Sequence, residues 1–230
     1  MLLKIFSAGA VKRGVAQIAQ QYEADSGNSV AVEFDTAPSL RERIKRGETA
    51  DVLVMPPAML DELARAGLVD NAHRGYIGRS RMGLFVKRGG AVPDISTVDG
   101  FTRAILASDA VVYNTASSGL YMEKLLQKLG LYPQLQTRIV KVDSGAAVMQ
   151  QVAAHPGDAI GCGQLSEIRV QLDKGVGIAL AGALPDEIQN ATPYDGAAMA
   201  IGSQSAAAHA LVAALTSQAA KAVFASTGID

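Results

Sequence analysis

Residues 2–22 read LLKIFSAGAVKRGVAQIAQQY, and the order of residue types in this stretch decides the fold. The apolar run at 2–6 is typical of a strand, and it ends in four small residues, Ser7 to Ala10. From Val11 onward, apolar side chains recur at the spacing of one helical face. The small-residue turn is either the tight connection that any α/β protein needs or a place where backbone amides meet a bound anion.

The alternation of strand and helix continues along the chain. Glycines at 27 and 130 follow expected helix ends, and Pro57 suits a first helical turn. We expect strands at 2–6, 29–34, 51–55, 82–89, 110–113, 138–142, 158–163, 177–181 and 191–202, and helices at 11–25, 39–46, after Pro57, at 97–107, 120–130, 146–154, 166–172 and 206–226. This order predicts an α/β fold with mainly parallel sheets flanked by helices.

Two irregular stretches, near 75–82 and at 193–196, interrupt the alternation. They predict two lobes joined by two hinge crossings, near 76–82 and 191–196. Lobe 1 is then discontinuous, with residues 1–78 and 195–230, and lobe 2 contains residues 79–194. The alternative is a single doubly wound sheet of similar size.

The composition excludes several function classes. The formal net charge is −1, with 21 basic and 22 acidic residues, so we expect no nucleic-acid partner. Apolar runs are too short to span a bilayer, and MLLKIF is too short for a signal peptide. Nucleotide-binding and hydrolase motifs are absent, and we expect no cofactor. The three histidines, His73, His155 and His209, are far apart in the sequence, so we expect surface or capping roles and no metal site.

Four turns that follow strands share a composition of small and hydroxyl-bearing residues. They are SAGA (7–10), DTAPS (35–39), NTASSG (114–119) and DSGA (143–146). In an open parallel sheet, ligands bind beyond the carboxyl ends of the strands, and helix N-termini favour negative charge there. The simpler interpretation of each turn is a helix cap, because Ser, Thr, Asp and Asn are good N-caps.

Other candidate residues lie in or beside these turns. Lys12 and Arg41 are cations within one turn of a helix start, where a cation opposes the helix dipole, so they are candidates to pair with a ligand. If the protein is an enzyme, the acid–base candidates are Asp143, Asp35 and Tyr113. Cys162 lies between two glycines at a strand end, and a buried small hydrophobe is the default interpretation.

Taken together, these segments resemble the periplasmic molybdate-binding protein family, a branch of the type 2 periplasmic solute-binding fold. The resemblance rests on the order and spacing of FSAGAV, AQQYEADSG, FDTAPSLRERI, GETADVLVMPP, SSGLYMEKLLQKLG, IGCGQLSEI and KAVFASTGI. It implies two α/β lobes with a small anion held by helix N-termini in a cleft between them. It further implies a periplasmic location and membrane subunits of an ABC transporter as partners, whereas a native start at Met1 would imply the cytoplasm. We expect a monomer that does not insert into the membrane.

The departures from this family bear on the ligand. Ala10, Ala37 and Cys162 stand where the resemblance implies two serines and a tyrosine that hold the oxyanion, while Ser118 replaces an alanine. An organic carboxylate is therefore a better ligand than molybdate or tungstate. An alternative is an enzyme similar to aconitate isomerase, which resembles the same family and moves a proton across an allylic tricarboxylate. The expected ligand-binding positions are Ser7, Ala8, Gly9, Ala10, Lys12, Thr36, Ala37, Ser39, Arg41, Asn114, Ser117, Ser118, Gly119, Ser144 and Cys162.

Overall fold

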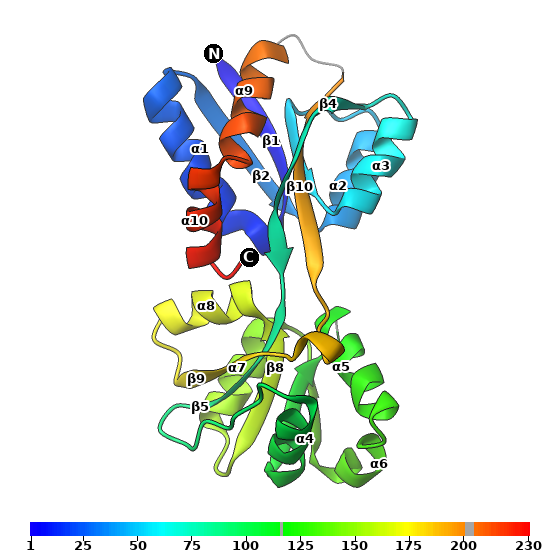
Figure 1. Ribbon diagram of the computed structural model, residues 1–230, viewed down its shortest axis with the longest axis vertical. Helices are drawn as coiled ribbons and strands as arrows, with labels where there is room; N and C mark the ends of the chain where they lie inside the picture. Colours follow the sequence, from blue (N-terminus) through cyan, green and yellow to red (C-terminus); the bar gives the residue numbers. More distant parts are fainter. Residues whose placement is uncertain (116, 201–204) are drawn as a thin grey trace. The chain divides into compact units, whose positions relative to one another are not determined.

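The computed structural model describes residues 1–115, 117–200 and 205–230, which form two compact units (Figure 1). Unit 1 contains Met1–Ser80 and Thr192–Asp230, and unit 2 contains Arg81–Ala191. Each unit has its own five-stranded sheet. The α/β class predicted from the sequence is confirmed.

Unit 1 is built on a sheet with the strand order β2-β1-β3-β10-β4. Its elements are β1 (Leu2–Ala8), the 3-10 turn η1 (Gly9–Val11), α1 (Lys12–Ser26), β2 (Ser29–Asp35), α2 (Ala37–Lys45), β3 (Val52–Met55), α3 (Pro57–Arg65), β4 (Val69–Ser80), β10 (Thr192–Met199), α9 (Ser205–Leu215) and α10 (Gln218–Ser226). Strands β1, β2 and β3 are parallel, and β10 runs antiparallel to both β3 and β4.

Unit 2 repeats this plan with the strand order β7-β6-β8-β5-β9. Its elements are β5 (Met82–Lys87), α4 (Val98–Ala107), β6 (Ala110–Asn114), α5 (Ser117–Lys128), α6 (Tyr132–Leu135), η2 (Gln136–Arg138), β7 (Ile139–Val142), α7 (Gly145–Ala154), β8 (Ala159–Gln164), α8 (Leu165–Asp173), β9 (Ile178–Ala183) and η3 (Asp186–Ile188). Strands β6, β7 and β8 are parallel, and β5 is antiparallel to β8 and β9.

Both sheets are therefore mixed, with three adjacent parallel strands in each and antiparallel pairs beside them. The chain leaves unit 1 along β4 and returns along β10, so these neighbouring strands must run in opposite directions. Strand β4 was not expected, because the segment 70–74 has no alternation of apolar and polar residues and none of its residues is buried. The first turn was also placed too early, since β1 continues through Ser7 and Ala8.

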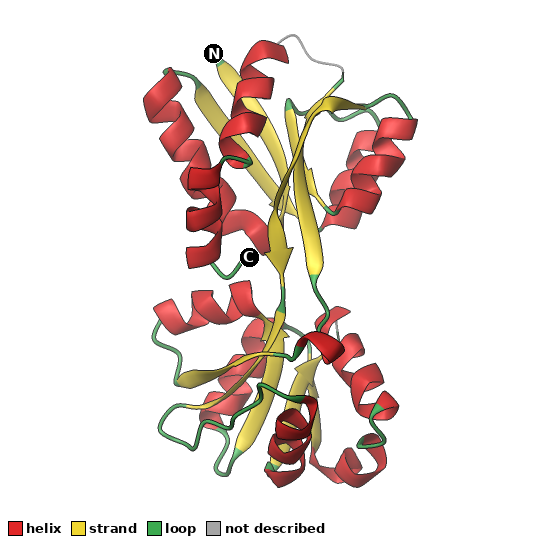
Figure 2. Ribbon diagram, viewed as in Figure 1, coloured by secondary structure: helices red, strands yellow, loops and turns green. Residues whose placement is uncertain are grey.

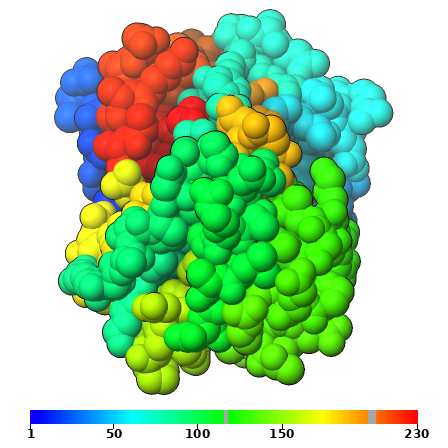
Figure 3. Space-filling view, turned by 60° about the horizontal axis from the view of Figure 1, so that its bottom comes forward, coloured from blue at the N-terminus to red at the C-terminus, as the bar shows by residue number. Residues whose placement is uncertain are grey.

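Helices cover both faces of each sheet (Figure 2). In unit 1, α1 packs against α9 and α10, so that the C-terminal helices lie beside the N-terminal helix (Figure 3). The ring of Phe224 on α10 is buried against Gly14 of α1, where a β carbon would overlap the ring. The hydroxyl of Tyr22 donates to the carbonyl of Ala207 on α9 at 3.1 Å. These contacts hold the two C-terminal helices, α9 and α10, against the N-terminal helix α1.

We predict that Gly14→Ala destabilises the protein, although alanine is the better helix former. Overpacking of a close contact costs about 1–3 kcal/mol of unfolding free energy, which exceeds the gain in helix propensity of about 1 kcal/mol. Urea unfolding measures the difference. Gln17→Ala, at an exposed position of the same helix, is the control and is expected to change the unfolding free energy little. A Gly14→Ala variant as stable as the parent would contradict the packing of Phe224 on α1.

Candidate functional site

The carboxyl ends of β1, β2 and β3 meet at one edge of the unit 1 sheet. Ala8 pairs with Asp35, and Ser7 pairs with both Phe34 and Val54. This register brings the first two predicted turns, SAGA and DTAPS, side by side on neighbouring strands. The structure therefore assembles at one edge two segments that are about 30 residues apart in the sequence.

In the first turn, no side chain caps the start of the helix that follows. Alanine and valine, Ala8 and Val11, occupy the N-cap positions of η1 and α1, and neither side chain can accept a hydrogen bond. Gly9 is exposed and Ala10 is half-buried, whereas the buried hydroxyl of Ser7 donates to the Ala8 carbonyl at 3.2 Å. Lys12 is exposed in the first turn of α1.

In the second turn, a side chain of the turn itself caps the helix that follows, α2. The hydroxyl of Thr36 accepts from the Ser39 amide at 3.3 Å, and the Asp35 carboxylate accepts from the Thr36 amide and from the Ser39 hydroxyl at 2.7 and 2.5 Å. The Ser39 hydroxyl, followed by the Thr36 amide, holds the pKa of Asp35 below its usual range. The turn therefore already holds a carboxylate of its own, which competes with an external anion.

Two further predicted positions in this segment, Arg41 and Ala37, also contact other parts of unit 1. Arg41 pairs with Glu42 at 2.8 Å and with Glu62 at 3.2 Å, and these neighbours raise its pKa, with the Glu42 hydrogen bond first. Ala37 is buried as the first residue of α2. The role of Arg41 in ligand binding stays a prediction, and it requires release from these two ion pairs.

In unit 2, a buried polar cluster lies at the carboxyl end of β6. The side-chain amide of Asn114 donates to the hydroxyl of Ser118 at 3.0 Å and accepts from the Gly119 amide at 3.0 Å. A β carbon on Gly119 would collide with the Asn114 carbonyl, so glycine is required there. The side chain of Ser117, another predicted position, lies outside the described residues, although its backbone begins α5.

The last predicted turn follows β7, which pairs in parallel with β6 so that Val142 lies beside Asn114. The exposed Ser144 accepts from the Ala147 amide at 3.2 Å and so caps α7. The carboxylate of Glu167, from α8, lies against Gly145. Asp143 is exposed at the end of the strand.

Tyr113 and Cys162 are buried in the core rather than displayed in a turn. The Tyr113 side chain is 1% exposed, its hydroxyl has no hydrogen-bond partner among the described residues, and burial raises its pKa. Burial likewise raises the pKa of the Cys162 thiol to about 12. The interpretation of Cys162 as a buried small hydrophobe is confirmed.

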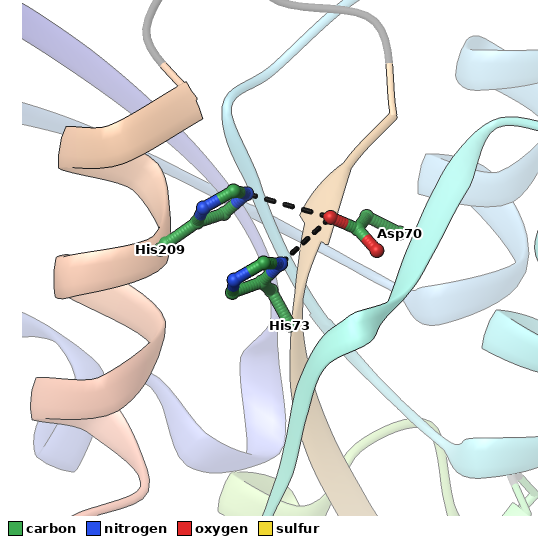
Figure 4. Close-up of side chains that lie close together, drawn as sticks. All are labelled: Asp70, His73 and His209. Atoms are coloured by element: carbon green, nitrogen blue, oxygen red, sulfur yellow. Dashed lines mark hydrogen bonds and ion pairs between the residues drawn. The ribbon is translucent and has the colours of Figure 1, made fainter.

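Sequence reasoning missed two features. Ser166, at the start of α8, is buried, and its hydroxyl has no partner within the described part of the chain. Its position after β8, in QLSEI, follows the same rule as the four turns. The second feature corrects an expectation, because His73 and His209, which are far apart in the sequence, stack with ring centroids 3.3 Å apart (Figure 4).

Comparison with known proteins identifies the family of this chain. The profile of the bacterial extracellular solute-binding proteins matches residues 3–230. This chain belongs to that family. The resemblance to solute-binding proteins that the sequence motifs indicated is confirmed, and the carboxyl-edge turns of this solute-binding protein are the natural place to look for its ligand.

Three individual proteins are also similar to this chain over nearly its whole length. An aconitate isomerase from Pseudomonas sp is 30% identical over an alignment of 237 positions, gaps included. The alignment covers 96% of this chain and 85% of the relative. A transporter substrate-binding domain from Clostridium difficile has a TM-score of 0.81 at 18% identity, with 99% and 97% of the two chains covered. The periplasmic molybdate-binding protein of Azotobacter vinelandii has a TM-score of 0.72 at 19% identity, covering 99% and 98%. The two structures share the fold with this chain.

The self-capped second turn generates a prediction about Asp35. Ser39→Ala removes the main hydrogen bond that lowers the Asp35 pKa, so the pKa is expected to rise toward the usual value of about 3.9. Because the folded-state pKa is lowered, the stabilisation is present above the unfolded pKa and is lost as pH falls through the folded one. A carbon-detected NMR titration of the Asp35 carboxyl measures the shift. Ser144→Ala, which removes a cap in unit 2, serves as the control, and an unchanged Asp35 pKa in Ser39→Ala would contradict the capping.

Proposed function

We propose that this solute-binding protein binds a small organic polycarboxylate of the aconitate type. The observation that carries the proposal is the 30% identity, across 96% of this chain, to a protein whose name says that it acts on aconitate. The family supports binding of a solute in general. The finer assignment to a carboxylate rests on the chemistry of the carboxyl-edge turns.

In unit 1, the open first turn favours a carboxylate. Backbone amides at a helix start attract negative charge, and the exposed ammonium of Lys12 adds a full positive charge beside them. A carboxylate is bound well by one cation together with backbone amides.

A tetrahedral oxyanion such as molybdate suits these turns less. It needs several hydroxyl and amide donors that converge on four oxygens, yet Ser7 donates to a backbone carbonyl and Ser39 donates to Asp35. The Asp35 carboxylate lies at the second turn of unit 1 and repels a compact dianion there. A polycarboxylate spreads its charge over separate groups, so a single carboxylate can occupy the first turn without a second charge beside it.

Unit 2 has a neutral polar pair at the carboxyl end of β6. The hydroxyl of Ser118 and the amide of Asn114 are 95% or more buried and hydrogen-bonded to each other. Such a pair can turn its donors toward a carbonyl or hydroxyl oxygen without bringing a charge. The family membership also supports a transport role, in which the membrane subunits of an ABC-type uptake system receive the ligand. Among the described residues, no helix has the length and apolar character needed to cross a membrane.

Lys12→Gln tests the first turn. Loss of its charge is expected to weaken the binding of trans-aconitate by about tenfold, as measured by isothermal titration calorimetry. Lys221→Gln, an exposed lysine on α10, is the matched control and is expected to leave the affinity unchanged.

A parallel thermal-shift series with citrate, sulfate and molybdate checks the ligand class, because a ligand that binds the native state raises the melting temperature. Stabilisation by molybdate alone would overturn the proposal.

A second candidate function is isomerisation of aconitate, which the same relative favours. In that reaction a base removes a proton from the methylene carbon, the double bond shifts, and the proton returns to the former vinyl carbon. The base must be accessible to the bound substrate and accept a proton readily. Asp143 meets the first condition, whereas Tyr113 is buried and the pKa of Asp35 is held low.

The reaction is tested by incubating the protein with trans-aconitate in deuterated water. If the protein is an isomerase, proton NMR will show cis-aconitate with deuterium in its methylene group. Asp143→Asn is then expected to lower the turnover at least a hundredfold while trans-aconitate still binds. Asp99→Asn, an exposed aspartate on α4, is the control. Binding without any turnover by the unaltered protein would reject isomerisation and leave the binding proposal standing.

A further inference from the structure

The sheet edge opposite the carboxyl-edge turns of unit 1 carries a cluster of Asp70, His73 and His209 (Figure 4). Strand β10 pairs Ala198 with Asp70 but Ala197 with Arg74, so residues 71–73 form an extra loop within β4. This bulge interrupts the register of β4 with β10. It places the His73 ring beside Asp70, while α9 supplies His209 from the end of the chain.

One carboxylate oxygen connects the two rings. The Oδ2 atom of Asp70 is 2.7 Å from Nδ1 of His73 and 3.4 Å from Nε2 of His209. The other oxygen, Oδ1, accepts from the Ala72 amide at 2.9 Å, which fixes the orientation of the carboxylate. Such support of a ligating group by a backbone amide is typical of metal sites.

The spacing of the donor atoms fits a single ion. One atom from each residue forms a set within 4.8 Å of one another. A tetrahedral zinc with bonds of about 2.0–2.1 Å places its ligand atoms about 3.4 Å apart. The 3.4 Å separation between Asp70 and His209 matches this value, whereas the 2.7 Å between Asp70 and His73 is a hydrogen-bond distance that must lengthen slightly when both groups bind one ion.

The cluster is accessible to an ion from solvent. The side chains of Asp70, His73 and His209 are 31%, 42% and 27% exposed. Asp70 and His209 line an open hollow together with Met199 and Ala200. A site with three protein ligands and an open side leaves room for water as the fourth ligand.

We propose that Asp70, His73 and His209 bind a divalent transition-metal ion, with zinc as the representative. Two imidazole nitrogens and one carboxylate oxygen select zinc or its neighbours over magnesium and calcium, which prefer oxygen ligands. The three ligands come from β4 and α9, so the ion fastens α9 to the amino end of the sheet. The site is independent of the carboxylate ligand, because it lies at the opposite edge of the same sheet.

The test is a calorimetric titration of the tag-free, chelator-treated protein with zinc chloride. The expected result is one zinc per chain, with no heat from magnesium chloride. His209→Gln is expected to weaken zinc binding by at least about tenfold. His155→Gln is the matched control, because the His155 ring contacts the backbone of its own turn in unit 2 and is expected to leave zinc binding unchanged.

Cobalt(II) provides a second readout that does not depend on heat. Its visible absorption reports tetrahedral coordination by nitrogen and oxygen, and the band is expected to disappear in His73→Gln. Thermal melts of each variant establish that it is folded. Failure of zinc to bind the unaltered protein, or equal affinity in His209→Gln, would overturn the proposal, whatever the outcome of the aconitate titration.

Discussion

The structure of unit 1 depends on the insertion of β10 between β3 and β4. This strand comes from the last fifth of the chain, yet it pairs antiparallel with β3 through Asp195 to Ala198 and with β4 along its whole length. Without it, β4 would have no place in the sheet, and α9 and α10 would have no face of the sheet to cover. The same pairing defines two opposite ends of the sheet, with the candidate ligand-binding turns at one and the Asp70 cluster at the other.

Much of the fold can be predicted from local pattern, because each buried strand and amphipathic helix carries its own periodicity. The helix expected at 97–107 is capped by Thr97, whose hydroxyl accepts from the Gly100 amide at 3.0 Å, and Gly27 ends α1 in the left-handed conformation. Strand β4 could not be predicted in this way. Its hydrophobic residues are separated by the polar bulge at 71–73, and its place in the sheet is set by β10, more than a hundred residues later.

The candidate site shows a different limit of sequence reasoning. Composition identifies residues with hydroxyls and carboxylates, but it cannot tell which of them are already bonded within the protein. Thr36 and Ser144 cap their own helices, and Arg41 is held by two glutamates, whereas the first turn has no side chain that could cap it. The histidine pair was missed for the related reason that a contact between His73 and His209 depends on tertiary structure and leaves no local pattern.

The central claim is that the open first turn receives a carboxylate of the ligand. The most direct test is to follow the backbone amide resonances of ¹⁵N-labelled protein by NMR while trans-aconitate is added. We predict that the amides of Gly9, Ala10 and Val11 shift most within unit 1, while those of Asp70 and Ala72 at the opposite edge do not move. Saturable shifts that leave residues 9–11 unaffected would contradict the account.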